Sequence, residues 1–459
     1  MATGADPHEV PAQRRALGTL DATVLVLANV VGVGIFLTPA GVAALARTPA
    51  WYFALWACGG AIALAGALSY AELGAALPEA GGEYVYLREA FGPLWAFLHA
   101  WASFLVTFSG AIAAIAVGVG EYGLRAAGAA AAGAPLPASA VRAAAIAAVA
   151  GLTVLNGIGV KATSRFQNAL TGLTLAAIGL LLLLGFGGGR GSLTHLTAAA
   201  VPPAPAPTWA ALGTALLPIF FTYAGWNAPT YVAGEVARPG RTLPRALALG
   251  TGGAAALYLA LNLLYVYAFP LPRLQQALSV GEAAAAALIG PRAAGGFAGL
   301  ITLITLGALN VTILTAARIT YALGRDGAFF PALGALHPRT GTPALALAVQ
   351  AAWVIVLILT GTFEFLLTFA TVMMVVVSGL TVAAVFVLRA RAPRLPRPFR
   401  VWGYPVVPAL YLAACAGMGA SAVAERPAAS LAALGLLAAG IPVFRWRPAR
   451  GARAPAPPP

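Results

Sequence analysis

The residues Gly32-Val33-Gly34-Ile35-Phe36, followed by Pro39, lie in the middle of the first long apolar run of the chain. Two glycines one residue apart weaken a helix and leave backbone amides without their usual partners. Such backbone is tolerated at membrane depth only where it is buried in protein or lines a cavity. A helix broken there offers free N–H groups and the positive end of its dipole to an anion such as a carboxylate. Close helix packing through small residues is the alternative, and the 53 glycines of the chain allow it.

Residues 220–229, with the sequence FFTYAGWNAP, predict a second break in a later apolar run. Pro229 disfavours helix just before it, and Gly225 adds conformational freedom. Carbonyl groups freed at this break would suit an ammonium group, and Thr222 and Asn227 supply polar side chains nearby. Two interrupted helices, the first and the sixth, indicate a transporter site built from inverted repeats.

The composition is that of a membrane protein. Hydrophobic residues make up 60% of the 459 positions and charged residues only 9%, too few charges to cover a soluble domain of this length. Each membrane crossing needs about 20 apolar residues. Apolar runs fall at about residues 19–46, 52–77, 93–124, 138–157, 165–187, 209–235, 246–270, 295–323, 344–361, 364–389, 406–425 and 428–446. We therefore predict an all-α membrane protein with twelve transmembrane helices, and a short surface helix at residues 279–289.

The basic residues predict how the chain is oriented. With the N-terminus inside, most of the 27 Lys and Arg residues fall in the inner loops and at the two termini. The positive-inside rule then places both termini in the cytoplasm, so the formal net charge of +14 requires no nucleic acid partner. Lys161 is the only lysine among many arginines, and alanine is abundant, which we interpret as codon bias in a GC-rich genome. We expect a multi-pass protein of a bacterial inner membrane.

Further motifs accompany the two breaks. They are PEAGGEY at 78–84 with REAFG at 88–92, the run from GEV at 234–236 to PRA at 244–246, and TAAR at 315–318 with GRDG at 324–327. Together with the helix-one string and residues 221–227, these motifs resemble the amino acid–polyamine–organocation superfamily. The branch they resemble most is the L-type-like amino acid transporters. The resemblance extends in order over the first ten apolar runs.

The resemblance implies a core of five plus five helices related as inverted repeats, with two extra helices. The core would occupy residues 19–389, with repeats at about 19–187 and 209–389. Residues 406–446 would form the two accessory helices. Residues 1–18 would be a cytoplasmic segment and residues 447–459 a disordered cytoplasmic tail.

The resemblance also implies a secondary transporter that moves neutral L-amino acids by alternating access. The implied substrate-binding residues are Val30, Val33, Gly34, Ile35, Phe221, Ala224, Trp226 and Asn227. Backbone amides at 33–35 would bind the substrate carboxylate, and carbonyls at 30, 221 and 224 would bind its amino group. Phe221 also matches the aromatic residue that caps the substrate, and Asn227 matches a polar residue of the pocket.

Three departures from the family pattern concern partners and ion coupling. Residues 125–137 contain no cysteine, so no disulfide-linked heavy chain is expected. Thr174 occupies the position of a lysine in helix five, and a threonine cannot titrate. Thr315 is followed by Ala316 where sodium-coupled relatives carry two adjacent hydroxyls. We therefore favour exchange or facilitated movement over sodium coupling, with proton coupling through another group as the alternative.

Other classes of function fit less well. A membrane enzyme needs acids, histidines or a nucleophile that converge at one depth, and no motif implies a cofactor or a metal site. A sensor built on a transporter fold would carry a signalling domain. A cationic amino acid or polyamine permease would need a carboxylate in its pocket, and neither break contains one.

The remaining polar residues of the apolar runs favour structural roles. Glu72, Glu121, Glu235 and Glu364 lie near predicted membrane boundaries, which favours interfacial ion pairs. His99 is expected to be a hydrogen-bonded residue of the bundle and not a proton carrier. Tyr84 and Arg88 predict an amphipathic helix in the first inner loop that moves with the gate.

Overall fold

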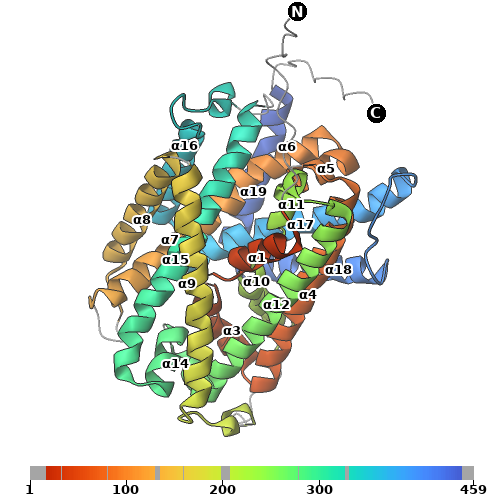
Figure 1. Ribbon diagram of the computed structural model, residues 1–459. Coiled ribbons are helices and arrows are strands. Elements are labelled where there is room, and N and C mark those ends of the chain that lie inside the picture. The colour runs from red at the N-terminus through yellow and green to blue at the C-terminus, as the bar shows by residue number, and fades with distance from the viewer. Residues whose placement is uncertain are drawn as a thin grey trace, which may run out of the picture.

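The computed structural model is a bundle of helices (Figure 1). It describes residues 17–32, 34–79, 81–129, 135–158, 160–197, 207–277, 279–325 and 330–446. Over these ranges the only β contact is an isolated bridge between Leu17 and Val236, and no strand is present. The predicted all-α membrane class is confirmed. The predicted terminal segments lie outside the described residues, except for Leu17 and Gly18.

Ten helical segments of the described chain are long and apolar enough to cross a membrane. They are Thr19–Leu37 (α1 and α2), Pro49–Ala76 (α4), Pro93–Ala126 (α6 to α7), Ala138–Ile158 (α8), Ala169–Gly187 (within α9, Val160–Gly187), Pro239–Ala268 (α12), Gly296–Tyr321 (within α15, Pro291–Arg325), Phe363–Arg391 (α17), Val406–Glu425 (α18) and Pro427–Trp446 (α19). Two shorter apolar helices, α10 (Trp209–Tyr223) and α16 (Ala344–Thr360), accompany them. Each predicted apolar run contains one of these helices, although α10 and α16 fall short of the spanning length.

The first apolar run is interrupted at the predicted place. Helix α1 (Thr19–Val30) ends before Val31, and α2 (Gly34–Leu37) begins at Gly34. Thr38 connects α2 to α3 (Pro39–Ala46). The backbone N–H and the hydroxyl of Thr38 both donate to the carbonyl of Gly34, at 2.9 and 2.8 Å. The first break therefore lies between α1 and α2, and α3 continues the direction of α2.

The second break lies between α10 and α11 (Ala228–Tyr231). Gly225 in this break has a φ of +105°, a backbone conformation that L side chains rarely adopt. A β-carbon at this position would also lie 2.7 Å from the carbonyl oxygen of Asn29 in α1. Both the conformation and the close approach of the two breaks therefore require glycine here.

The third apolar run contains a feature that the sequence did not predict. A π-helical turn, η1 (Ser103–Thr107), separates α6 (Pro93–Ala102) from α7 (Phe108–Ala126). A π turn disturbs the regular ladder of backbone hydrogen bonds. Here Trp353 of α16 donates its indole N–H to the carbonyl of Leu105, at 2.8 Å. Helix α16 is thereby tied to the turn.

Two short helices in the loops were predicted. Helix α5 (Glu83–Phe91) is the expected helix of the first inner loop. Helix α14 (Val280–Leu288) matches the helix predicted at 279–289, but the prediction that it lies on the surface is wrong. Val280, Glu282 and Leu288 are buried, and α14 packs against α15. Its Gly281 approaches Phe36 of α2, so the helix covers one end of the broken segment.

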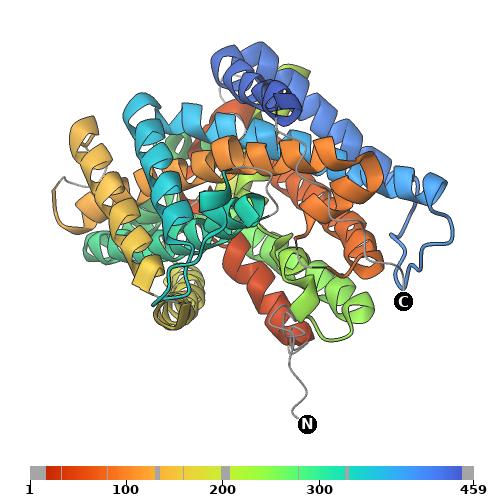
Figure 2. The same cartoon turned by 90° about the horizontal axis from the view of Figure 1, so that it is seen from above.

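The two breaks lie in the middle of the bundle. Helix α12 packs along α4 and α1, and α15 packs along α7 and α9. Figure 1 shows α10 between the group of α7 and α15 and the group of α4 and α12, and Figure 2 shows α1 (red) beside α12 (green). The larger hydrophobic core extends through all of them and includes the side chains around the breaks.

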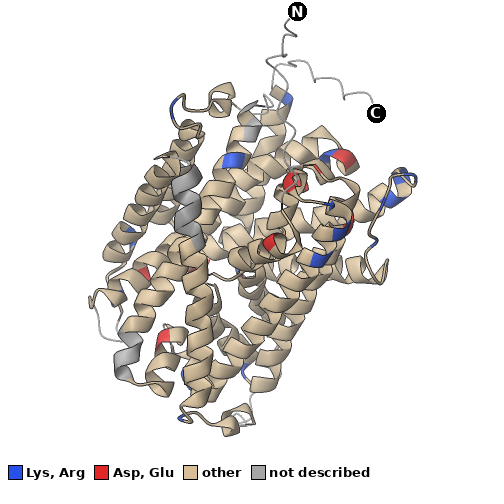
Figure 3. Ribbon diagram, viewed as in Figure 1, with Lys and Arg blue, Asp and Glu red and all other residues tan. Residues whose placement is uncertain are grey.

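Charged residues gather mainly at the end of the bundle that carries α5 (Figure 3). Three of the four predicted ion pairs are present: Glu72 with Arg389 at 2.6 Å, Glu121 with Arg125 at 2.6 Å, and Glu364 with Arg426 at 2.8 Å. Glu235 forms no ion pair with any described residue. Acidic side chains at membrane boundaries are thus mostly neutralised by arginine.

Candidate functional site

A cavity of about 1050 Å³ lies where the two breaks meet. Its walls come from both breaks, from α6 to α7, from α15 and from α17. From the breaks it extends toward the end of the bundle that carries α5, where Glu79, Arg88 and Pro343 line it. Among the described residues, no loop at the opposite end contributes to the lining. Within the described part of the chain, the cavity therefore opens at one end, the end that the arginine distribution assigns to the cytoplasm.

The first break rests directly on α10. Thr222 of α10 is the nearest neighbour of Gly34, and its hydroxyl lies 3.0 Å from the hydroxyl of Thr38. The Thr222 hydroxyl also donates to the carbonyl of Pro218, at 2.7 Å. The backbones of α2 and α10 are therefore held together at the depth of the cavity.

Tyr258 of α12 forms hydrogen bonds to backbone carbonyls at both breaks. Its hydroxyl lies 2.6 Å from the carbonyl oxygen of Val30 and 3.1 Å from that of Thr222. Both carbonyls lie at the C-terminal ends of helices, where no backbone N–H of the same helix is available to donate to them. The motifs around the breaks do not indicate this residue, because Tyr258 lies far along the chain from both breaks.

The structure brings together most of the predicted site residues. Val30, Gly34, Phe221, Ala224, Trp226, Asn227 and Thr315 all line the large cavity. Ile35 is fully buried and does not line it. Val33 lies outside the described residues. The amides at the start of α2 have no partners within that helix, and the carbonyl of Phe221 accepts a bond from the N–H of Ala224, at 3.0 Å.

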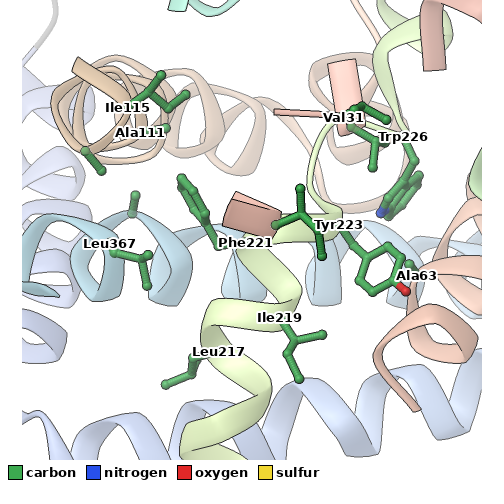
Figure 4. Packing of buried hydrophobic residues seen from close by; sticks show 14 of the residues in the cluster. Val31, Ala63, Ala111, Ile115, Leu217, Ile219, Phe221, Tyr223, Trp226 and Leu367 are labelled. Atoms are coloured by element: carbon green, nitrogen blue, oxygen red, sulfur yellow. The ribbon is translucent and has the colours of Figure 1, made fainter. Parts of the chain in front are cut away.

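The aromatic residues of the second break point in different directions. Figure 4 shows Phe221 directed toward Ala111 and Ile115 of α7, whereas Tyr223 and Trp226 lie on the other side of α10. The ring of Trp226 meets that of Tyr70 edge to face, at 4.8 Å between centroids. Phe221 is therefore placed at the cavity wall facing α7, and Trp226 is fixed against α4.

A carboxylate does reach the second break, contrary to the inference from the sequence. Glu83 of α5 is buried and accepts a hydrogen bond from the side-chain amide of Asn227, at 3.1 Å. The hydroxyls of Tyr70 and Tyr231 also donate to it, the latter at 2.9 Å. The inference considered only residues at the breaks themselves, and Glu83 comes from a distant helix. The sequence feature that could have pointed to Glu83 is its place as an acidic residue at the start of a predicted loop helix.

Thr174 and Thr315 do not share a site. Thr174 lines a separate small cavity of about 10 Å³ between α1 and α15, together with Ala28, Val31 and Ala308. Its hydroxyl donates to the carbonyl of Leu170, at 2.8 Å. Thr315 lines the large cavity. The position of Thr174 beside the first and eighth apolar runs is the one expected for it, and its role in coupling stays a prediction.

The arrangement is suited to binding and not to bond breaking. The cavity offers backbone groups of both breaks, together with side-chain amides and hydroxyls, at the middle of the bundle. Across the described residues, no group of His, Cys, Asp and Glu side chains could hold a metal ion. Helix ends of this kind bind small zwitterions in transporters with broken helices.

Comparisons with known proteins agree with this geometry. The family model described as amino acid permease matches residues 17–432. The chain is 29% identical over 441 residues to the Asc-type amino acid transporter 1 of Mus musculus, an alignment that covers 94% of the chain and 81% of the relative. It is 28% identical over 439 residues to the large neutral amino acids transporter small subunit 2 of Mus musculus, with coverage of 94% and 81%. It is 27% identical over 401 residues to the b(0,+)-type amino acid transporter 1 of Oryctolagus cuniculus, with coverage of 86% and 80%.

The matched region begins at the first described residue and ends within α19, so it contains both breaks and the whole cavity. The resemblance drawn from the short motifs is confirmed over nearly the full chain. The chain belongs to the amino acid permease family of the amino acid–polyamine–organocation superfamily, a family of membrane transporters and not of enzymes.

Proposed function

We propose that this protein moves neutral L-amino acids across a cytoplasmic membrane by alternating access. The observation that carries the proposal is the convergence of both helix breaks on one large cavity. The amides at the start of α2 suit the substrate carboxylate, and the carbonyls of Val30, Phe221 and Ala224 suit its amino group. Phe221 then lies between this position and α7, where it can cover the substrate.

The single mouth of the cavity corresponds to one state of an alternating-access cycle. Because the mouth lies beside α5, at the end with most of the charged residues, we assign it to the cytoplasmic side. The protein would then be inward-facing, with both termini in the cytoplasm. Helix α14 packs over the opposite end of α2 and would move when the site opens outward. We place the protein in a bacterial inner membrane, without a disulfide-linked heavy chain.

A cationic amino acid or polyamine is the second candidate substrate, because Glu83 lies at the second break. Three arguments favour the neutral substrate. Glu83 already accepts three hydrogen bonds, its side chain is only 8% exposed, and His99 lies beside it. A substrate cation would have to displace these donors to reach the carboxylate.

We infer that the substrate gradient itself drives transport, by exchange or facilitated movement. Thr174 offers no titratable group between α1 and α15, and Ala316 offers no second hydroxyl. A sodium site needs several oxygens at short range, and Thr174 and Thr315 line different cavities.

Uptake into proteoliposomes tests the proposal. Labelled alanine, serine, leucine, arginine and putrescine are supplied to vesicles that contain unlabelled amino acid, or none, with or without imposed sodium and pH gradients. We expect uptake of the neutral amino acids, stimulated by internal amino acid. High-affinity binding of arginine or putrescine alone would refute the neutral substrate, and concentrative uptake driven by sodium into empty vesicles would refute exchange.

A further inference from the structure

Glu83 and His99 form a pair of ionisable side chains in the wall of the cavity. The Nδ1 atom of His99 lies 3.7 Å from Oε2 of Glu83, and both side chains are nine-tenths buried or more. Both residues belong to the lining of the cavity. Ionisable groups in such a position are costly and commonly serve a function.

The hydrogen bonds around the pair leave one place for a proton. Oε1 of Glu83 accepts from Tyr70 and Asn227, and Oε2 accepts from Tyr231. Nδ1 of His99 has no hydrogen-bond partner within the described part of the chain. A proton between Oε2 and Nδ1 would give this nitrogen a partner. It would also take the pair from one net negative charge to none, which lowers the cost of its burial.

The other ionisable groups around the pair are tyrosines, carboxylates and arginines. The facing tyrosines are Tyr70 on α4, Tyr86 on α5, Tyr231 on α11 and Tyr411 on α18. Burial raises the pKa of Tyr86 further above the ordinary tyrosine value of about 10. The charged groups on the neighbouring elements include Glu72, Glu79, Arg88, Glu89, Glu235, Arg318, Arg389, Arg391 and Arg445. Among them, Arg88 is paired with Glu79 and Glu89, and Arg389 is paired with Glu72.

We propose that Glu83 and His99 together bind one proton from the cavity, and that this proton regulates the second break. The inference rests on the proposed transport function and adds a regulatory ligand to it. The unprotonated carboxylate holds Asn227 and Tyr231, one at each end of the short helix α11. Once Oε2 shares a proton with Nδ1, its bond with Tyr231 weakens. The second break, which contributes to the substrate site, is then held less firmly to α5.

The proton belongs to the pair and not to one residue, because two groups this close titrate together. It enters and leaves through the single mouth of the cavity. In this proposal it modulates transport and is not carried along with the substrate. This distinguishes the proposal from proton symport, in which a pH gradient drives accumulation.

Exchange of labelled alanine at equal pH on both sides of the vesicle tests the proposal. For one proton we expect the rate to follow a single titration, in which the ratio of protonated to unprotonated protein changes about tenfold per pH unit. Glu83→Gln keeps an acceptor but cannot bind the proton, so its rate should be constant and equal to that of the native protein in acid. His99→Gln should also flatten the profile. His337→Gln is the matched control, since His337 is exposed and outside the cavity lining, and its profile should match the native one.

Infrared difference spectroscopy of the purified protein between acid and neutral pH supplies a readout that does not need transport. We expect carboxyl and imidazole bands in the native protein that are absent from both Glu83→Gln and His99→Gln. Native protein that exchanges alanine at a rate independent of pH, or bands that persist in both variants, would overturn the proton site. Titrating bands in a protein that moves no amino acid would support the proton site and overturn the proposed function instead.

Discussion

A β-carbon on Gly34 would lie 2.6 Å from the hydroxyl oxygen of Thr222 and 2.9 Å from its α-carbon. The backbone of α2 therefore lies directly against α10, with no room for a side chain between them. The sequence left two explanations for this glycine open, a broken helix and close packing. The structure shows that both apply at one residue, because the break is also the contact between the two interrupted runs.

Gly34→Ala is expected to lower both stability and uptake. A methyl group at this contact must displace backbone, and overpacking of this kind costs about 1–3 kcal/mol. Thermal unfolding and alanine uptake of the purified variant measure the effect. Gly41→Ala in α3 is the control, because a β-carbon there meets no atom within 4 Å. Equal uptake by the two variants would show that the contact with Thr222 can relax without loss of function.

Tyr258→Phe is expected to raise the KM for substrate. The variant leaves the carbonyls of Val30 and Thr222 without their shared donor, at a cost of about 1–3 kcal/mol for a buried polar group. Concentration-dependent uptake measures the change. Tyr265→Phe on the same helix is the matched control, since its hydroxyl is buried and bonds to none of the described residues. A larger effect from the control would argue against a role for the shared hydroxyl.

Glu72→Gln is expected to destabilise the protein strongly. The Glu72 carboxylate accepts two bonds from Arg389, at 2.8 and 2.6 Å, and one from the N–H of Val401, at 2.7 Å. Breaking a buried ion pair costs about 3–5 kcal/mol. Glu364→Gln removes the exposed pair with Arg426, which is worth at most about 1 kcal/mol. Thermal unfolding of both variants should show the larger shift for Glu72→Gln, and the reverse order would contradict this account.

Thr174→Lys is expected to make transport depend on pH. The residue lines a cavity of about 10 Å³ beside Ala28, Val31 and Ala308, so an ammonium group placed there would be poorly hydrated and would titrate. Thr174→Met adds a long side chain without a charge and controls for its bulk. Exchange rates at several pH values compare the two. Identical profiles would mean that a lysine at this position does not couple protonation to transport.

The sequence predicts those parts of the site whose cause is local. Glycine and a following proline interrupt a helix through their own backbone, so both breaks could be located from a few adjacent residues. Tyr258 and Glu83 could not be assigned in this way. Each acts on a backbone or side-chain group that is distant along the chain, and only the packing of α12 and α5 brings them to the breaks.

His99 is a further residue whose contact could not be predicted from its neighbours in the sequence. Alone in an apolar run it was predicted to be a hydrogen-bonded residue of the bundle. Its Nδ1 instead faces Glu83 without a hydrogen bond to any described residue. The sequence alone does not connect the two residues, because the rest of α5 and the start of α6 lie between them, whereas the packing of α5 against α6 places them together.

The π turn at Ser103–Thr107 affects which side of α7 faces the cavity. Such a turn holds one more residue than the same stretch of α-helix, so every later side chain is rotated by about 100°. Ala111 and Ile115 line the cavity as a result. A deletion of one codon within the turn would restore a regular helix and present another set of side chains to the cavity. In evolution this segment is therefore expected to tolerate changes of residue type and to resist changes of length.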